Sequence, residues 1–380
     1  MGHLVIFGHR GQGPTSRRFE NQILPNDVLP ENSISAFEKA LQDGADGIEL
    51  DVFITKDGKI VVCHDNELDR NVNGHFNHWN SNDELEIGKI ADKTLAEVKE
   101  YDIGNGEHMP ELQEVLHLVD QYNKKTGKNI TINIEIKGKG PIVDKVYETM
   151  NDAVQSETTS FDWSSFMVNS FDRDALAKMH SLNPDNKLRL SFGIYTWSVF
   201  GARDSTGPKW LPVQRKPAED GNGEILTNDQ GTVLLKKEID VASFEEIVKK
   251  AKNAGCNAVD VVSSDLTESM FEICNRHNMH ITATTNMIRA RAQKDIEFPG
   301  HNLSDEQIEE EEIYKMYNFS KKYPNVAIYY KADTPKHAVV CRQELEAAAN
   351  LTKSSIFAQS PSSLQQDQPK VDNENKVTHK

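Results

Sequence analysis

The sequence alternates short β-rich apolar runs with amphipathic segments of helical spacing over most of its 380 residues. This alternation is typical of a parallel sheet whose strands are joined by crossover helices. Eight such runs are present, and eight βα units predict an α/β fold of the closed (β/α)8 type, the TIM barrel. The runs lie at residues 4–7, 48–54, 130–136, 166–168, 188–194, 258–262, 280–285 and 326–330.

Three intervals between the runs are too long for simple crossovers, namely residues 60–129, 196–240 and 286–325. In a barrel, such excursions are normally loops or small subdomains rather than separate folds. We therefore predict one barrel over residues 1–345. It carries a small insertion subdomain after the second barrel strand, at about residues 60–129, and long loops in the other two intervals.

Two other segments are strongly polar. The acidic run from Glu309 to Glu312 precedes Ile313 and Met316, and we interpret it as the solvated side of a helix. From about residue 352 onward the composition turns to Ser, Gln, Asn and Lys, with little apolar surface to offset the entropy of ordering. Residues 352–380 are therefore predicted to be a disordered polar tail.

The charge and composition exclude several classes of partner. The formal net charge is −16, which repels the phosphates of nucleic acids and anionic membranes, so we expect no nucleic-acid partner. No stretch approaches the roughly 18 consecutive apolar residues of a membrane span, and the N-terminus resembles no export signal. We expect no stable membrane anchor and a cytoplasmic location, with secretion by a route that does not use an N-terminal signal peptide as the alternative. Four isolated cysteines are predicted to be free thiols: Cys63, Cys256, Cys274 and Cys341.

Two of the apolar runs carry carboxylates at alternate positions. Glu49 and Asp51 must share one face of their strand, and Glu135 shares a face with Asn133 and Lys137 in the next run. Carboxylates on an apolar strand are costly unless a cation lies between them. An all-oxygen ligand set suits one hard divalent cation, Mg²⁺ or Ca²⁺, better than zinc. The alternative is a buried salt-bridge network between Lys137 and these carboxylates.

Two histidines follow predicted strands at the ends where barrel active sites are built. His9 follows the first run, and His64 follows an extra strand formed by residues 59–63. Imidazoles titrate near neutral pH, so a pair of them can act as general acid and general base. A single histidine at a strand end is usually structural, but two beside three carboxylates favour a catalytic site.

These residues lie in motifs whose order and spacing resemble those of the glycerophosphodiester phosphodiesterases. The resemblance covers about residues 3–340. Its most specific parts are His9-Arg10-Gly11, Pro30-Glu31-Asn32, the segment 44–52 with Glu49 and Asp51, Thr55-Lys56-Asp57-Gly58, the segment 61–65 with His64, Met109-Pro110-Glu111-Leu112, and Glu135-Ile136-Lys137.

The resemblance implies a (β/α)8 barrel with a small insertion after His64 and a metal-dependent hydrolysis of glycerophosphodiesters to an alcohol and glycerol 3-phosphate. It places Glu49, Asp51 and Glu135 on the family's metal ligands and His9 and His64 on its acid and base. Arg10 and Lys137 match its phosphate-binding cations. Glu31 lies in the matching Pro-Glu-Asn motif, where it orients Arg10 or a histidine; an ordinary charge at a helix N-terminus is the alternative.

Two other functions stay open. A phospholipase D of the sphingomyelinase type has a similar site but releases a cyclic phosphate from a lipid. A silent barrel would bind phosphodiesters without cleaving them, although it would not need paired imidazoles. The motifs containing Glu31 and Asp57 favour the diesterase, whose substrate is a small molecule.

The match weakens toward the C-terminus. Where the family commonly shows Trp-Thr-Val-Asn on the seventh strand, this chain has Ala283-Thr284-Thr285-Asn286. We therefore expect the aromatic wall beside the leaving group to be missing and the pocket to be wider. The family's Thr-Asp-x-Pro on the eighth strand is matched only loosely, by residues 332–335.

Overall fold

A computed structural model gives the structure of the protein. It describes residues 4–16, 18, 19, 21–74, 87–183, 188–194, 203, 204, 207, 208, 213–217, 223–225, 227, 235–287, 290, 291 and 303–358. Residues Met1–Arg342 form one compact unit, and Gln343–Lys380 form a second.

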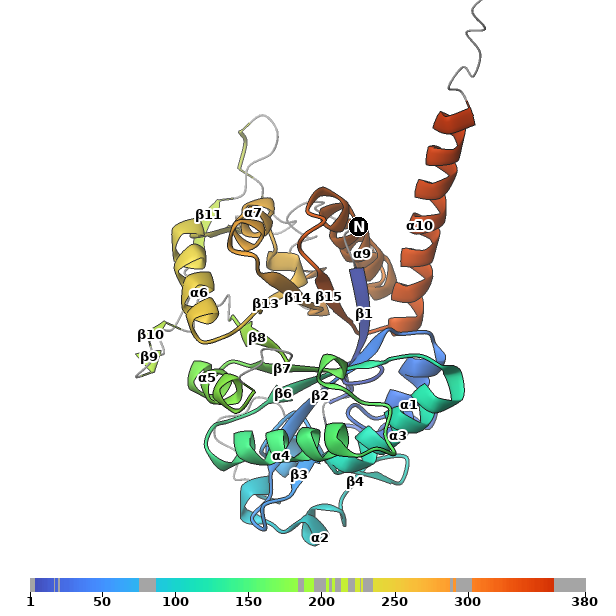
Figure 1. Ribbon diagram of the computed structural model, residues 1–380, viewed down its shortest axis with the longest axis vertical. Helices are drawn as coiled ribbons and strands as arrows, with labels where there is room; N and C mark the ends of the chain where they lie inside the picture. Colours follow the sequence, from blue (N-terminus) through green and yellow to red (C-terminus); the bar gives the residue numbers. More distant parts are fainter. Residues whose placement is uncertain are drawn as a thin grey trace, which may run out of the picture. The chain divides into compact units, whose positions relative to one another are not determined.

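Eight parallel strands close into a barrel, as the sequence pattern predicts (Figure 1). Their order is β1-β15-β14-β13-β8-β7-β6-β2, and β1 also pairs with β2, which closes the ring. Each predicted run coincides with a strand to within a few residues. The strands are β1 (Leu4–His9), β2 (Gly47–Ile54), β6 (Thr131–Ile136), β7 (Phe166–Ser170), β8 (Arg189–Gly193), β13 (Ala258–Val262), β14 (His280–Thr284) and β15 (Ile328–Ala332).

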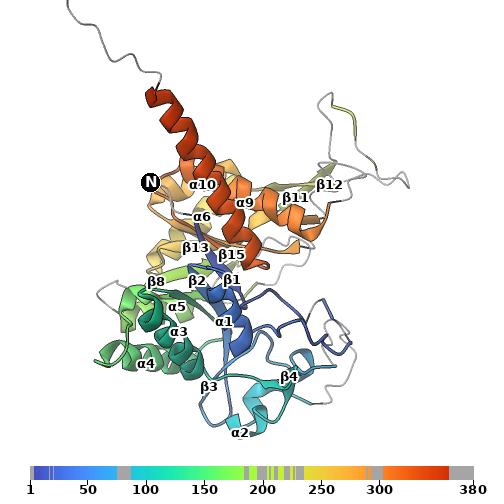
Figure 2. The same cartoon turned by 90° about the vertical axis from the view of Figure 1, so that its right-hand side faces the viewer.

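Helices lie around the outside of the strands (Figures 1 and 2). Their apolar residues recur at helical spacing and are buried against the barrel, while start and stop signals limit their length. The hydroxyl of Ser33 accepts the N–H of Ala36 at the start of α1, and Gly127 ends α3 in the left-handed conformation. These helices are α1 (Ile34–Gln42), α3 (Leu112–Thr126), α4 (Pro141–Gln155), α5 (Arg173–Leu182), α6 (Val241–Asn253), α7 (Glu268–His277) and α9 (Asp305–Lys322). Helix α10 (Pro335–Ala358) begins in the first unit and continues into the second.

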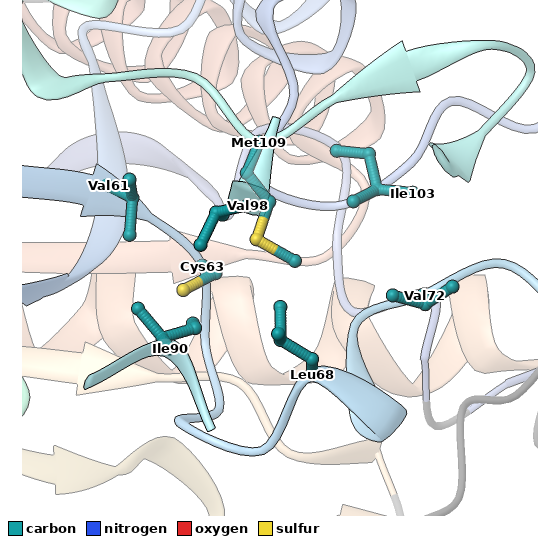
Figure 3. Close-up of a cluster of buried hydrophobic side chains, with 8 residues drawn as sticks. All are labelled: Val61, Cys63, Leu68, Val72, Ile90, Val98, Ile103 and Met109. Carbon is teal, nitrogen blue, oxygen red and sulfur yellow. The ribbon is translucent and has the colours of Figure 1, made fainter. Parts of the chain in front are cut away.

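The predicted interval 60–129 contains a subdomain and a barrel helix. Strand β3 (Ile60–Val62) pairs antiparallel with β2, and α2 (Leu95–Val98), β4 (Asp102–Gly104) and β5 (Glu107–His108) follow it. Helix α3 then contacts α1 and α4, so it belongs to the outer layer of the barrel. The subdomain has a core of its own (Figure 3), made of Val61, Cys63, Leu68, Val72, Ile90, Val98, Ile103 and Met109. All four cysteines of the chain are buried and free, as predicted.

The long intervals in the C-terminal half are described only in part. In the interval 196–240, strands β11 (Val213–Pro217) and β12 (Leu235–Ile239) pair antiparallel. Strands β9 (Arg203–Asp204) and β10 (Gly207–Pro208) form a second short pair. Helix α10 continues to Ala358, past the predicted start of the polar tail at residue 352, and residues 359–380 lie outside the described part.

The acidic run on α9 corrects the sequence prediction. Glu310 is exposed, but Glu309 and Glu312 are buried, with 0% and 4% of their surface accessible. The two buried residues are three apart, so they share the helix face that also carries Ile313, and this helix packs on β15 and β1. The solvated-face interpretation is wrong for Glu309 and Glu312.

Candidate active site

The centre of the site is a group of three carboxylates on two neighbouring strands. Strands β2 and β6 pair in parallel, with Glu49 opposite Asn133 and Asp51 opposite Glu135. Glu49, Asp51 and Glu135 are buried, and each offers one oxygen within 4.8 Å of the others. Strand alternation therefore brings the side chains together as predicted, and we call these three residues the acidic triad.

Two cations lie against the acidic triad. Lys137 directly follows β6, and its Nζ lies 3.0 Å from Asp51 Oδ1 and also contacts Glu135 Oε1. The backbone N–H of Arg10 donates to Glu49 Oε2 at 3.0 Å, and Arg10 Nε lies 3.5 Å from Asp51 Oδ2. Burial acts to lower the pKa of each cation, but the nearby carboxylates outweigh it and raise both pKa values. Both side chains are therefore charged at neutral pH.

Arg10 lies in a tight turn that a glycine makes possible. The φ angles of Arg10 and Gly11 are 50° and 91°, both in the left-handed region. A Cβ on Gly11 would lie 2.7 Å from the Cβ of Ala36, so only glycine fits there. The turn bends the chain directly after β1, and His9 and Arg10 both line the cavity described below.

Glu31 and Asn32 hold this turn against the acidic triad. Glu31 Oε1 accepts from Arg10 Nη1 at 2.8 Å, and its Oε2 accepts from the backbone and hydroxyl of Ser16. Burial would raise the pKa of Glu31, but the charges of Arg10 and His64 and the hydrogen bonds from Ser16 and Arg10 together lower that pKa. The amide of Asn32 donates to Asp51 Oδ2 at 3.1 Å, and its backbone N–H donates to the carbonyl of Arg10. Glu31 thus orients Arg10, which is one of the roles considered from the sequence. The sequence analysis did not predict that Asn32 hydrogen-bonds to both Asp51 and Arg10.

Each predicted histidine contacts a carboxylate through Nδ1. His9 Nδ1 lies 2.6 Å from Asp333 Oδ1, and His64 Nδ1 lies 3.0 Å from Asp65 Oδ2. In the tautomer that donates from Nδ1, Nε2 is left to exchange a proton with a substrate. Burial and the positive charges of Arg10 and Lys137 lower the pKa of His64, so its neutral form is favoured at neutral pH.

A cavity of about 460 Å³ joins these groups. His9, His64, Glu135 and Lys137 all line it, which places both histidines at the cavity that the acidic triad reaches. Ala283 is not among its described lining residues. Its side chain is fully buried, and strand alternation sets it opposite to Thr284, which does line the cavity. The position faces away from the pocket, so an indole there would not line it, and Ala283 gives no reason to expect a wider pocket.

Three comparisons with known proteins agree with this arrangement. The profile of the Glycerophosphoryl diester phosphodiesterase family matches residues 9–259. The chain belongs to this family.

Two curated relatives, both called glycerophosphodiester phosphodiesterase, come from Caldanaerobacter subterraneus and Bacillus altitudinis. The chain is 34% identical to the first over 171 residues, which cover 43% of this chain and 62% of the relative. It is 35% identical to the second over 191 residues, which cover 48% and 64%. The matches therefore span somewhat less than two thirds of these relatives.

Solved structures support the fold of this family member. A glycerophosphoryl diester phosphodiesterase structure from Silicibacter pomeroyi aligns over 90% of this chain and 94% of its own, with a TM-score of 0.54 and 17% identity. A phosphodiesterase of Oleispira antarctica, solved with the product sn-glycerol-3-phosphate, aligns over 89% and 96% with a TM-score of 0.53 and 16% identity.

The family motifs did not point to a second buried network, which lies on β7, β13 and β15. Lys331 on β15 is 1% exposed, and its Nζ lies 2.7 Å from Asp260 Oδ2, 3.3 Å from Glu49 Oε1 and 3.9 Å from Glu135 Oε2. Asn169 on β7 donates to Asp260 Oδ2 at 2.7 Å and to Glu135 Oε2 at 3.3 Å. The available signals were Lys331 and Asp260, each within an otherwise apolar strand. Neither has a second charged residue two positions away on its strand, as Glu49 has in Asp51.

The acidic triad fits a divalent cation by its chemistry. Three buried carboxylates converge from two strands and offer only oxygen, the donor that hard cations prefer. Lys137 and Lys331 both touch the triad, so the salt-bridge network weighed as an alternative exists as well. The two are compatible, because each carboxylate has two oxygens: Glu49, Asp51 and Glu135 would hold the cation, and the lysines would balance the remaining negative charge. This family member therefore has an acidic cluster suited to a divalent metal.

Proposed function

We propose that the protein hydrolyses glycerophosphodiesters to an alcohol and glycerol 3-phosphate with one divalent cation, Mg²⁺ or Ca²⁺. The observation that carries the proposal is the cavity lined by both histidines, Glu135 and Lys137 in a chain of this family. The curated relatives bear the name of this activity, and the Oleispira antarctica structure has its product bound.

Phosphodiesters resist hydrolysis because their negative charge repels nucleophiles and an alkoxide is a poor leaving group. Arg10 and Lys137 line the cavity as fixed cations, so they can bind the phosphate and stabilise the charge that builds on it. Glu31 holds the Arg10 guanidinium in place, which makes its predicted part in substrate binding an indirect one.

His9 and His64 divide the proton transfers in this proposal. One accepts the proton of the nucleophile at Nε2, and the other donates a proton to the departing alcohol. A cation held by Glu49, Asp51 and Glu135 would supply charge neutralisation at the phosphate and would acidify a nearby water or hydroxyl.

The remaining proposals concern the chain as a whole. We assign the barrel with its insertion to residues 1–345, a small-molecule phosphodiester as the partner, and the cytoplasm as the location. Among the described residues, no helix is both long and apolar enough to cross a membrane.

Purified protein should be assayed on glycerophosphocholine with and without EDTA, and the phosphorus product identified by ³¹P NMR. We expect glycerol 3-phosphate, with activity lost in EDTA and restored by Mg²⁺ or Ca²⁺. A cyclic phosphate as the final product would favour the phospholipase D reaction of the sphingomyelinase type. Binding without turnover at any metal concentration would favour a silent barrel, and either result would reject the proposal.

A further inference from the structure

Helix α9 brings a buried carboxylate to the edge of the active site. Glu309 is fully buried, although it lies in an acidic run whose next residue, Glu310, is exposed. Its Oε1 accepts the backbone N–H of Asp333 at 3.0 Å, and its Oε2 contacts the hydroxyl of Thr334. Glu309 therefore binds the two residues that follow β15.

Asp333 continues this chain of contacts to a predicted catalytic residue. Its side-chain Oδ1 lies 2.6 Å from His9 Nδ1. Glu309, Asp333 and His9 also line a second cavity of about 570 Å³, and His9 lines the active-site cavity as well. Three residues from α9, the end of β15 and the end of β1 are thus connected through direct contacts.

We propose that Glu309 is a positioning residue for His9, acting through Asp333. Glu309 holds the backbone at Asp333, and this fixes the carboxylate that sets the tautomer and ring orientation of His9. This inference rests on the proposed function, because it assumes that His9 transfers a proton during turnover.

The argument depends on where each contact is made. Asp333 follows the last residue of β15, Ala332, so its conformation is not determined by the β-ladder. A histidine that shuttles protons must keep one nitrogen aimed at the substrate, and a displacement of about 1 Å can cost 10²-fold in rate. A fully buried carboxyl group that is hydrogen-bonded to a backbone N–H and to a hydroxyl is a rigid anchor for such a segment.

The state of Glu309 makes a conservative rescue possible. Burial and the nearby charge of Asp333 raise the pKa of Glu309 to about 8, so the protonated form prevails at neutral pH. The amide of glutamine resembles that form. Its oxygen can accept the N–H of Asp333, and its NH₂ group can donate to the hydroxyl of Thr334.

The test compares variants of the full chain with its divalent cation bound. We expect Glu309→Ala to lower kcat on glycerophosphocholine by about 10-fold to 100-fold with little change in KM. Glu309→Gln should restore kcat to within about threefold of wild type by the same reasoning. Glu312→Gln is the matched control, because Glu312 lies on the same helix and is similarly buried. We expect it to leave kcat unchanged.

A double-mutant cycle separates positioning from general support of the fold. Adding Glu309→Ala to His9→Ala should cost less than about twofold, because the group it positions is already gone. Thr334→Val removes one contact of Glu309 while conserving shape, so it should lower kcat less than Glu309→Ala and show the same coupling to His9→Ala. This variant replaces Glu309→Ala in the cycle if Glu309→Ala does not fold. Equal losses in the wild-type and His9→Ala backgrounds would overturn the proposal, as would a Glu309→Gln variant no better than Glu309→Ala.

A spectroscopic measurement tests the same contact without turnover. We expect a downfield proton resonance for His9 Nδ1–H bound to Asp333, identified by its absence in His9→Ala. It should persist in Glu309→Gln and shift or broaden in Glu309→Ala or Thr334→Val. An unchanged resonance in both of the latter variants would reject the positioning role even if the protein proved inactive on every phosphodiester tested.

Discussion

The two sides of the active-site cavity are built differently. The side formed by β1, β2 and β6 carries its functional groups in short motifs, such as Glu49 with Asp51 and Glu135 with Lys137. The side formed by β13, β15 and α9 carries single ionisable residues. These lie far apart in the sequence and meet only in the fold: Asp260, Glu309, Lys331 and Asp333.

Two groups of the first side are more exposed than the buried lysine of the second side. The side chains of His64 and Lys137 are 17% and 19% exposed, whereas that of Lys331 is 1% exposed. A group that must reach a substrate needs access to the cavity, but a group that only fixes its neighbours does not. We infer that the first side performs the chemistry and that the second side holds the carboxylates and His9 in place.

Removing the triad should have the largest effect of the variants proposed here. Three variants each remove a charged ligand and keep its shape: Glu49→Gln, Asp51→Asn and Glu135→Gln. Mutating a residue that only hydrogen-bonds to a metal ligand typically lowers metal affinity or activity by about 10-fold to 100-fold. We therefore expect each of the three variants to lower both quantities by more than about 100-fold. Calorimetric titration with Mg²⁺ or Ca²⁺ measures the metal affinity, and a turnover assay measures the activity. Full turnover by the triple variant would place the metal elsewhere.

The histidines should come next. His9→Ala and His64→Ala should each reduce kcat by about 10²-fold or more, because general acid–base catalysis contributes that much. Thermal melts provide the control for folding. With p-nitrophenol as the leaving group, only the variant that lacks the general acid should recover, because this alcohol departs without a proton. Equal recovery of both variants would contradict a division of roles between His9 and His64.

The contrast between the two sides explains what could be predicted from sequence. Strand alternation is local, so the spacing of Glu49, Asp51 and Glu135 is enough to assign them to one face. The partners of Lys331 lie on three other strands, and their proximity depends on closure of the barrel. Glu309 was misread because charge runs usually face solvent. Asp333 gives it a backbone donor that no local pattern reveals.

Lys331 and Lys137 form a matched pair for testing the structural role of the second side. Lys331→Met leaves Glu49 and Asp260 without their buried cation, and breaking such a pair typically costs about 3 to 5 kcal/mol of unfolding free energy. Lys137→Met should cost less, because its site is partly open to water. Urea denaturation without metal measures both. The assignment of roles fails if Lys331→Met is as stable as wild type or if Lys137→Met is the less stable variant.

The smallest expected effect is a pH dependence of stability at His64. Burial and the charges of Arg10 and Lys137 lower its pKa in the folded state, while the unfolded chain keeps a value of about 6.5. Between these two pKa values the unfolded state binds more protons, so the free energy of unfolding falls as the pH is lowered through this window. Below the folded-state pKa the loss is complete, and the unfolding free energy no longer changes with pH on account of His64.

His64→Gln cannot bind this proton. The difference in unfolding free energy between wild type and this variant should therefore shrink from pH 7.5 to pH 5 in metal-free urea titrations. A difference that stays constant, or that grows toward acid, would mean that folding raises the pKa of His64 or leaves it unchanged.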